Sequence, residues 1–411
     1  MAKIAAFKAV RPIRDKVHLV PTRPYYSYKK NVLKAKLEDN PYTFLHIINP
    51  EFAAAKKTKA NSPERFAHVK EQYDAFRQDG ILIEDAQAHL YIYRQSQAGF
   101  TVQGFFAGVS VDDYLNGHVK RHEQTLTARE DIFTNYLDIV GFNAEPVLMT
   151  YAPDAQLQAY LDAYSKLRPE YEFTTTDRIT HELWVVSLED SAHICQLFAE
   201  IDSLYIADGH HRSASSARYV EQKRAAGIAL PEAATYFLSY LVPENQVRIS
   251  PFHRLLQSLN GLSAHDFLSK LSKIGQLSEI SQIGKPDGKH CMHIYLQQKS
   301  YAFIPHAALI NESDPVEKLD AYILSALILN PFFGITDLKT STEVAFVPGN
   351  ESLESIVQTV DSAKFEVAFI LQGLSMKEVK DVADANLNMP PKSTWVEPKL
   401  RSGLTIYTLH P

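Results

Sequence analysis

Segments typical of strands and segments typical of helices alternate between residues 146 and 226, and this alternation limits the fold more than any other feature of the sequence. The apolar stretch Pro146 to Tyr151 is followed by a helical pattern from Gln156 to Leu167, and the short apolar stretch Leu204 to Ala207 closes the series before another helical pattern. Strands and helices that alternate in this way pack as layers of helices on a sheet. We therefore expect a mixed α/β (α+β) protein.

The chain is long for a single hydrophobic core. It has 411 residues, of which 45% are hydrophobic and 22% are charged, and chains of this length usually divide into domains. Residues 260–411 carry their own strand and helix patterns, including an apolar helix expected from Asp314 to Leu329. We expect a first domain over residues 1–259 and a smaller α/β domain over residues 260–411, which contains a loop rich in Pro and Lys at residues 389–403.

Local signals mark where three helices begin. Ser62 precedes a helical pattern over Pro63 to Gln78, and Pro63 suits the first turn of a helix. Thr127 stands three residues before Glu130, and Ser375 stands three residues before Glu378. Both pairs have the spacing of a capping box, so we expect helices that begin at these two positions.

Charge and residue usage exclude several classes of function. Lys and Arg number 42 against 48 Asp and Glu, so the chain carries a net charge of −6 and nucleic acid is not an expected partner. Tyrosines and lysines at residues 25–30 resemble a base-stacking patch, which the acidic charge of the chain disfavours. The two cysteines, Cys195 and Cys291, lack the spacing of metal ligands, and we expect no zinc, haem or flavin. No apolar run is long enough for a membrane span and no signal peptide is recognisable, so we expect a cytoplasmic protein.

The stretch from Leu204 to Arg218 combines a strand, a turn and a helix with several reactive side chains. Gly209 allows the turn, and the amides of the following first helical turn, together with Ser213, would form an anion site. Arg212 adds planar donors that suit a phosphate. Asp208 is a candidate catalytic base and a candidate Mg²⁺ anchor. The alternative is an ordinary Asp turn followed by a solvated helix cap.

Two pairs of residues supply candidate acids and bases. His210 is a candidate acid and His211 a candidate phosphate ligand, but adjacent histidines in an extended chain point to opposite sides, so a metal site made of histidines alone is not expected. His122 and Glu123 stand just before the helix expected at residue 127 and are a candidate acid and base. The second histidine of a His-Glu-x-x-His zinc motif is missing. The alternative for this pair is an exposed charged turn.

Further basic and hydroxyl side chains are candidate phosphate ligands. Arg254 is one, and the Pro-rich loop supplies Lys392, Ser393, Thr394 and Lys399, which could close over an anionic substrate. The sequence before Lys392 is not the glycine-rich loop of a P-loop, so this is no Walker motif. The alternative is a basic surface loop held in place by its prolines.

The chain resembles, from end to end, the domain-of-unknown-function family DUF1015 of bacterial and archaeal proteins. The specific pieces are Asp-Gly-His-His-Arg at residues 208–212 and Pro-Lys-Ser-Thr at residues 391–394. The other pieces that carry the resemblance are Phe7 to Pro12, Asn40 to Leu45, His122 to Thr125, Glu145 to Val147, His181 to Trp184, Tyr205 to Ala207, Pro251 to Arg254 and the rest of Met389 to Gly403. The chain departs from the family at residues 24–27, where Pro-Tyr-Tyr-Ser replaces Pro-Tyr-Asp-Val.

The Asp-Gly-His-His-Arg motif also resembles the phosphate-binding strand-turn-helix of the ParB/sulfiredoxin superfamily, which includes free-serine kinases. This resemblance implies a phosphate at the turn, ATP or ADP as a candidate cofactor, and a small phosphorylated molecule as substrate, with phosphoserine or serine as the first candidate. The expected reaction is phosphoryl transfer or hydrolysis of a phosphate ester, by a serine kinase-like phosphotransferase or a phosphatase. The alternatives are a nucleotide-switched ParB-like binding module and a non-catalytic sensor of a phosphorylated metabolite. Nothing in the sequence indicates an oligomeric state.

Overall fold

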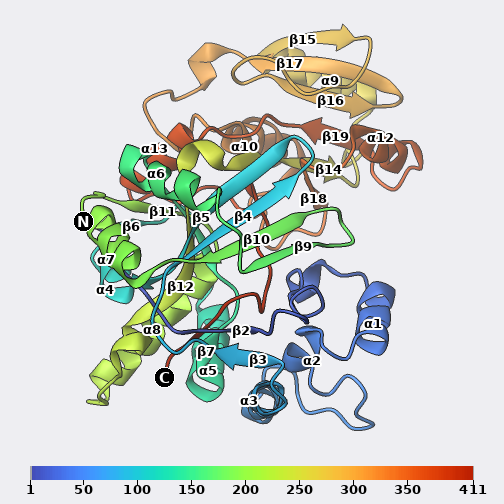
Figure 1. Cartoon of the computed structure of the whole chain (residues 1–411). Helices are drawn as coiled ribbons and strands as arrows, with labels where there is room; N and C mark the ends of the chain where they lie inside the picture. Colours follow the sequence, from blue (N-terminus) through green and yellow to red (C-terminus); the bar gives the residue numbers. More distant parts are fainter. Residues whose placement is uncertain (1, 411) are drawn as a thin grey trace. The chain divides into compact units, whose positions relative to one another are not determined.

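The computed structural model describes residues 2–410 and confirms a mixed α/β protein with several sheets (Figure 1). Contacts divide the chain into two compact units. The first unit comprises Met1–Arg121, Thr125–Val247 and Pro398–Pro411, and the second comprises His122–Gln124 and Arg248–Glu397. These units are defined by their contacts, so the division into separately folding domains at residue 259 stays a prediction.

A nine-stranded sheet forms the centre of the first unit. Its strands follow the order β6-β11-β8-β12-β5-β4-β10-β9, and β1 pairs with β5. The bounds are β1 Ile4–Ala5, β4 Tyr91–Gln97, β5 Phe100–Ser110, β6 Val119–Lys120, β8 Val147–Tyr151, β9 Tyr171–Thr174, β10 Thr180–Val185, β11 Leu204–Asp208 and β12 Tyr236–Pro243. Every residue of β8 and β12 is buried, as expected for central strands that are covered on both faces. Strand β11 runs parallel to β6 and antiparallel to β8.

A small four-stranded sheet and the remaining helices complete the first unit. The sheet has the order β3-β2-β21-β7, so the last strand of the chain pairs with strands from its beginning. These strands are β2 Ala9–Pro12, β3 Leu82–Glu84, β7 Phe142–Asn143 and β21 Ile406–Thr408. The helices are η1 Tyr25–Ser27, α1 Lys30–Asp39, α2 Leu45–Ile48, α3 Pro63–Gln78, α4 Val111–Leu115, α5 Thr127–Val140, α6 Ala155–Tyr164, α7 Leu188–Phe198, α8 His210–Ala225, η2 Glu232–Thr235 and η3 Glu244–Gln246.

All three helices begin where the sequence predicts, but only two of the three predicted caps form. The Ser62 hydroxyl accepts from the Arg65 amide at 3.3 Å at the start of α3, and the capping box of Ser375 forms in full. The capping box predicted at Thr127 is wrong, because Leu126 occupies the cap position of α5 and no side chain caps it. The hydroxyl of Thr125 instead donates to the Glu130 carboxylate, which leaves that carboxylate outside a capping box.

The second unit contains a six-stranded sheet with the order β15-β17-β16-β19-β14-β18 and a short pair, β13-β20. Leu256 of β14 packs into one hydrophobic cluster and its neighbour Leu255 into another, so the two faces of this sheet each bury apolar side chains. The bounds are β13 Arg248–Ser250, β14 Phe252–Leu256, α9 Ala264–Ile274, β15 Gly275–Ile280, β16 Met292–Leu296, β17 Lys299–Pro305, η4 Ala307–Leu309, α10 Asp320–Leu324, η5 Ser325–Leu329, α11 Asn330–Phe333, β18 Val344–Pro348, α12 Leu353–Asp361, β19 Val367–Ile370, α13 Met376–Asp384 and β20 Trp395–Glu397.

The helix predicted from Asp314 to Leu329 begins six residues later. The Asp314 carboxylate accepts from the amides of Val316 and Glu317 at 2.7 and 3.0 Å and so stabilises a turn there. The helix starts at Asp320, passes through one π-helical stretch, η5, and ends at Phe333. Pro331 lies in α11, directly after the π-helical stretch.

Candidate functional site

Strand β11 leads through Asp208 and Gly209 directly into helix α8, as the strand-turn-helix pattern predicts. The register of β11 against β8 shifts between Ile206 and Asp208, so the carboxylate stands at an irregular strand end. Gly209 has φ 106° and ψ 25°, a backbone conformation that residues other than glycine rarely adopt. The amides of Arg212 and Ser213 both donate to the Gly209 carbonyl, at 2.9 and 3.1 Å, and close the first helical turn.

The Arg212 side chain folds back over the glycine turn. A Cβ atom on Gly209 would lie 2.9 Å from the Nη2 atom and 3.0 Å from the Cζ atom of Arg212. The Nη1 atom of Arg212 donates to the carbonyl of Pro146, which precedes β8. The guanidinium is therefore fixed beside the first amides of α8, where the helix dipole also favours an anion.

Two cations converge on the Asp208 carboxylate. The Nζ atom of Lys399 lies 3.3 Å and the Nη2 atom of Arg212 lies 3.7 Å from Oδ2 of Asp208. Burial alone would raise the pKa of Asp208, but the charges of Lys399 and Arg212 and the Gly209 amide outweigh it and hold that pKa below its usual range. At neutral pH the site therefore consists of an ionised carboxylate, an ammonium and a guanidinium.

The histidines and the serine of the motif lie in the first turn of α8. His210 is buried, and Ser213 is fully buried with its hydroxyl donating to the His210 carbonyl at 3.0 Å. His211 is half-buried, and its Nδ1 atom has no hydrogen-bond partner among residues 2–410. Burial and the charge of Arg129 lower the pKa of His211, so its imidazole is neutral at pH 7.

The remaining candidates belong to the second unit. His122 is 2% exposed, burial lowers its pKa to about 4, and its carbonyl accepts from the Met389 amide at 2.8 Å, whereas Glu123 is exposed. Lys392 is exposed with its Nζ atom 5.4 Å from the centre of the Phe252 ring. The hydroxyl of Ser393 donates to the Pro390 carbonyl at 2.7 Å, and Thr394 is half-buried.

Arg254 enters the interior of the second unit. It is 1% exposed, its guanidinium lies 4.9 Å from the centre of the Phe346 ring, and it donates to the carbonyls of Phe252 and Pro391. No carboxylate among residues 2–410 pairs with it, and burial lowers its pKa to about 9. These contacts hold the Pro-rich loop against β14.

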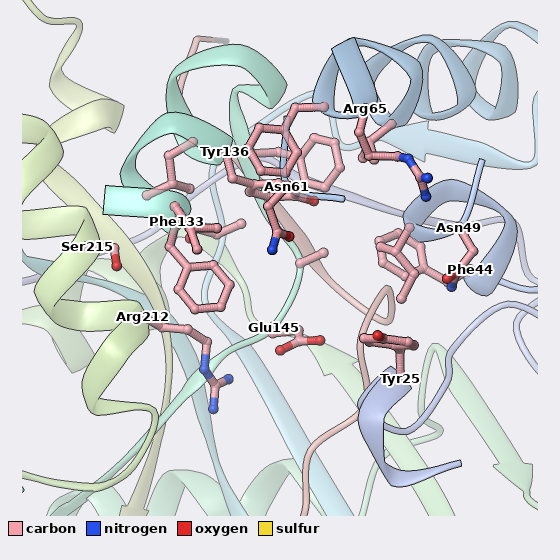
Figure 2. Close-up of a pocket in the computed structure, with 18 of the residues that line it drawn as sticks. Tyr25, Phe44, Asn49, Asn61, Arg65, Phe133, Tyr136, Glu145, Arg212 and Ser215 are labelled. Carbon is pink, nitrogen blue, oxygen red and sulfur yellow. The ribbon is translucent and has the colours of Figure 1, made fainter. Parts of the chain in front are cut away.

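A cavity of about 300 Å³ within the first unit has Arg212 in its wall. Figure 2 shows Arg212 and Glu145 at one end of this cavity, with Phe133 and Tyr25 also facing it. Other lining residues come from the segments around α2, α3, α5 and β7, and they include Phe44, Asn49, Asn61, Arg65, Phe66, Tyr136, Phe142 and Asn143. The cavity is largely aromatic and apolar, with polar groups near Arg212, as is usual for sites that bind small molecules.

Sequence reasoning missed most of this cavity. Glu145 was visible only as part of a family-like piece, and Tyr25 only as part of a tyrosine cluster. Phe133 lies on α5, and its side chain is 40% exposed. Bulky aromatic residues that interrupt the polar face of a helix are the signal that could have indicated a binding surface.

The described chain offers neither a cluster of metal ligands nor a helix that could span a membrane. Within residues 2–410, no three His, Cys, Asp or Glu side chains are grouped so that they could hold a metal ion. Over the same residues no helix combines the length and apolarity that crossing a bilayer requires. The predicted Mg²⁺ anchor, Asp208, is a single carboxylate that already faces two cations, so an Mg²⁺ ion there would depend on oxygen ligands from a substrate.

Comparisons with known proteins place the chain in a family. A free serine kinase in complex with AMP is similar with a TM-score of 0.37 and 12% identity over 73% of this chain and 91% of the kinase. A conserved hypothetical protein from Pyrococcus furiosus has a TM-score of 0.35 and 13% identity over 73% of this chain and 95% of its own. SbnI with a C-terminal truncation, from Staphylococcus aureus, has a TM-score of 0.37 and 14% identity over 74% of this chain and 87% of its own. No curated protein matches the chain. The family model for DUF1015, described as a protein of unknown function, matches residues 4–322, and the chain therefore belongs to DUF1015.

Proposed function

We propose that this protein is a cytoplasmic phosphotransferase or phosphatase that binds a small phosphorylated metabolite at the Gly209 turn. Phosphoserine, or serine as the acceptor, is the first candidate substrate. The observation that carries the proposal is the convergence of Arg212 and Lys399 on a carboxylate at the N-terminus of α8. Two cations beside a helix N-terminus form an environment that suits a phosphate dianion, and one of them, Arg212, also lines the cavity.

Phosphoryl transfer needs positioning and neutralisation of charge more than covalent help from the protein. The guanidinium of Arg212 can bind two phosphate oxygens at once, and the Lys399 ammonium can bind a third as a point charge. The N-terminus of α8 adds the positive end of the helix dipole. Together these groups would hold the phosphoryl group and stabilise the charge on its oxygens while it is transferred.

Asp208 has the ionisation state that a base requires. In the kinase direction it would accept the proton of the serine hydroxyl while the new oxygen–phosphorus bond forms and the bond to the departing phosphate breaks. In the hydrolytic direction a water molecule would take the place of that hydroxyl, and the ester oxygen would leave with a proton. Burial lowers the pKa of His122 to about 4, so its imidazole is neutral at pH 7 and does not suit the acid role, and His210 stays the candidate acid.

The cavity offers room for the base of a nucleotide beside the phosphate site. Tyr25 is 51% exposed and Phe133 is 40% exposed, and both line this cavity. Among the described side chains, Tyr25 and Phe133 are the two aromatic ones that are 40% or more exposed. A flat aromatic base would cover them. Glu145 could accept hydrogen bonds from ribose hydroxyls. We therefore propose ATP or ADP as the phosphoryl donor or acceptor, with its phosphates at Arg212.

Turnover with defined substrates tests the enzymatic proposal. The purified protein is incubated with phosphoserine, and separately with serine, Mg²⁺ and either ATP or ADP, and free phosphate and phosphoserine are measured. We expect turnover in one of these reactions and a loss of at least 100-fold in kcat/KM for Arg212→Ala, since charge-assisted contacts to the phosphate are removed. Arg224→Ala is the matched control, because Arg224 lies at the other end of α8 and pairs with Asp112. Absence of turnover over a wider panel of phosphorylated metabolites would contradict an enzymatic role and leave a sensor that binds phosphate.

Equilibrium binding tests the nucleotide proposal separately. Stacking of a base on an aromatic side chain contributes roughly 1–3 kcal/mol, so Phe133→Ala should weaken ADP binding by roughly 5- to 150-fold. It should leave the binding of inorganic phosphate unchanged. Leu188→Ala removes an exposed apolar side chain on α7 and serves as the control. If Phe133→Ala binds ADP like the wild type, the base does not occupy this cavity.

A further inference from the structure

The segment Pro398 to Gly403 returns from the second unit to the first and contacts both parts of the proposed site. Lys399 lies against Asp208, and the hydroxyl of Ser402 donates to Oε1 of Glu145 at 2.9 Å. The segment therefore links the phosphate turn to the wall of the cavity, although it is far from both in sequence.

The backbone of this segment is fixed on either side of Lys399. The side-chain amide of Gln95, on β4, donates to the Lys399 carbonyl at 3.2 Å. Ser402 and Thr22 exchange two backbone hydrogen bonds of 2.8 and 3.0 Å. Gly403 has φ 79°, and a Cβ atom there would lie 2.5 Å from the Phe44 ring. The backbone therefore packs against Phe44 so closely that only glycine fits at this position.

Between these points a buried arginine, Arg401, pairs with the partly exposed carboxylate of Asp177. The Nη2 atom of Arg401 lies 2.7 Å from both carboxylate oxygens of Asp177 and 3.1 Å from the Thr175 hydroxyl. The Arg401 side chain is 5% exposed, and its Nε atom has no partner within residues 2–410. Asp177 and Thr175 belong to the loop between β9 and β10, at the edge of the nine-stranded sheet. Without Asp177 the buried guanidinium of Arg401 would lack its countercharge, so the pair holds the segment at a fixed point on the sheet.

A lysine needs such an anchor more than an arginine does. Its ammonium is a point charge at the end of four rotatable methylene groups, and each contact costs side-chain entropy. Arg212 is fixed by the turn and by Pro146, but Lys399 contacts Asp208 from a segment without regular secondary structure. The direction of the Lys399 ammonium therefore depends on how firmly the backbone two residues away is held.

We propose that Arg401, held by Asp177, is a positioning residue that directs the Lys399 ammonium to the phosphate site. This inference rests on the proposed function, because it assumes that Lys399 binds the phosphoryl group. Arg401 itself touches neither substrate nor cavity. Its role is to make a residue from the end of the chain part of a site formed by β11 and α8.

Binding of inorganic phosphate to the full-length protein, measured by calorimetry, tests the proposal. We expect Arg401→Gln to weaken binding roughly 5-fold or more, and Lys399→Gln to weaken it at least as much. The double variant should bind no more weakly than Lys399→Gln alone, because two residues that act through one ammonium are not additive. Arg401→Lys, which keeps a charge against Asp177, should recover part of the loss. Arg94→Gln is the matched control, because it breaks a comparable Arg–Glu pair between β4 and β10 of the same sheet.

A second measurement separates positioning from stability. The rate at which acetic anhydride modifies Lys399, followed by mass spectrometry, should rise in Arg401→Gln toward that of the exposed Lys392 and should stay low in Arg94→Gln. If Arg401→Gln does not fold, Asp177→Asn carries the same test, since it removes the charge and keeps the size of the side chain.

The outcomes distinguish this inference from the proposed function. If Lys399→Gln weakens phosphate binding while Arg401→Gln and Asp177→Asn bind like the wild type, the positioning role is wrong and the phosphate site stands. Additive losses in the double variant would also refute it. If Lys399→Gln and Arg212→Ala both bind phosphate like the wild type, the phosphate site itself is wrong.

Discussion

Replacing Gly209 with alanine tests the geometry of the turn most directly. Alanine would have to adopt φ 106°, outside the left-handed region that side chains tolerate, at a cost of roughly 1–3 kcal/mol. Its Cβ atom would lie 2.9–3.0 Å from three atoms of the Arg212 guanidinium group. Because those atoms belong to the flexible end of a side chain, the guanidinium moves away and the backbone stays. The substitution therefore combines a loss of stability with a displaced Arg212.

The two effects are measured separately. A displaced guanidinium loses a charge-assisted contact of roughly 1.5–3 kcal/mol, so Gly209→Ala should bind inorganic phosphate roughly 10- to 150-fold more weakly. Gly227→Ala is the control, because Gly227 follows α8 at its other end, has φ 68°, and has nothing within 4 Å of the added Cβ atom. It should lower the urea midpoint of unfolding and leave phosphate binding intact. A Gly209→Ala variant that is less stable but binds phosphate like the wild type would show that the Arg212 position does not determine binding.

Two predictions concern the part of the first unit that walls the cavity. Glu51 contacts Thr58, His68 and Arg65, and their hydrogen bonds and charge outweigh burial and lower its pKa to about 2. The contribution of the Glu51 carboxylate to stability is then fully present above its ordinary pKa of 4.5 and is lost as the pH falls toward 2. The difference in urea midpoint between the wild type and Glu51→Gln should therefore shrink as the pH falls over that range. A difference that does not depend on pH would contradict this prediction. Ser62→Ala removes the N-cap of α3 and should lower the free energy of unfolding by about 1 kcal/mol, which urea denaturation measures; no change would show that the 3.3 Å contact contributes nothing.

Features of the structure could be predicted from the sequence where the interacting residues lie close together along the chain. The turn at Gly209 and the start of α3 were predictable because their signals lie within a few residues of each other. The capping box at Thr127 failed at the same short range, because the nearby Thr125 hydroxyl competes for the Glu130 carboxylate. Local patterns thus show which hydrogen bonds are available, whereas packing decides which of them form.

The candidate site mixes local and distant contributions. Lys399 and Asp208 are 191 residues apart, and no pattern along the chain indicates that they meet. Lys392 belongs to the same Pro-rich loop, yet it lies in the second unit over the Phe252 ring. Arg254 was a candidate phosphate ligand by residue type, but its place on β14 puts the guanidinium into the interior. Residue types indicated which chemistry the chain could perform. The strand register and the path of the segment Pro398 to Gly403 determine which of these residues lie at the Gly209 turn.

The charges at the turn lead to a final prediction about Asp208. A phosphate dianion that binds to Arg212 and Lys399 comes close to the Asp208 carboxylate, which faces the same two cations. At a separation of about 5 Å, with the screening expected for a side chain that is 38% exposed, this repulsion amounts to roughly 1–2 kcal/mol. Asp208→Asn should therefore bind inorganic phosphate about 5- to 30-fold more tightly than the wild type.

The same variant should lose turnover, because an amide cannot accept the proton of the attacking hydroxyl. Tighter binding combined with lost turnover would be the signature of a carboxylate that serves the reaction and not the binding of the phosphate. Calorimetry with inorganic phosphate and the phosphoserine assay measure the two quantities on one preparation. If Asp208→Asn binds phosphate more weakly than the wild type, the carboxylate instead orients Arg212 and Lys399. If turnover then falls only by the same factor as phosphate binding, Asp208 is not the base.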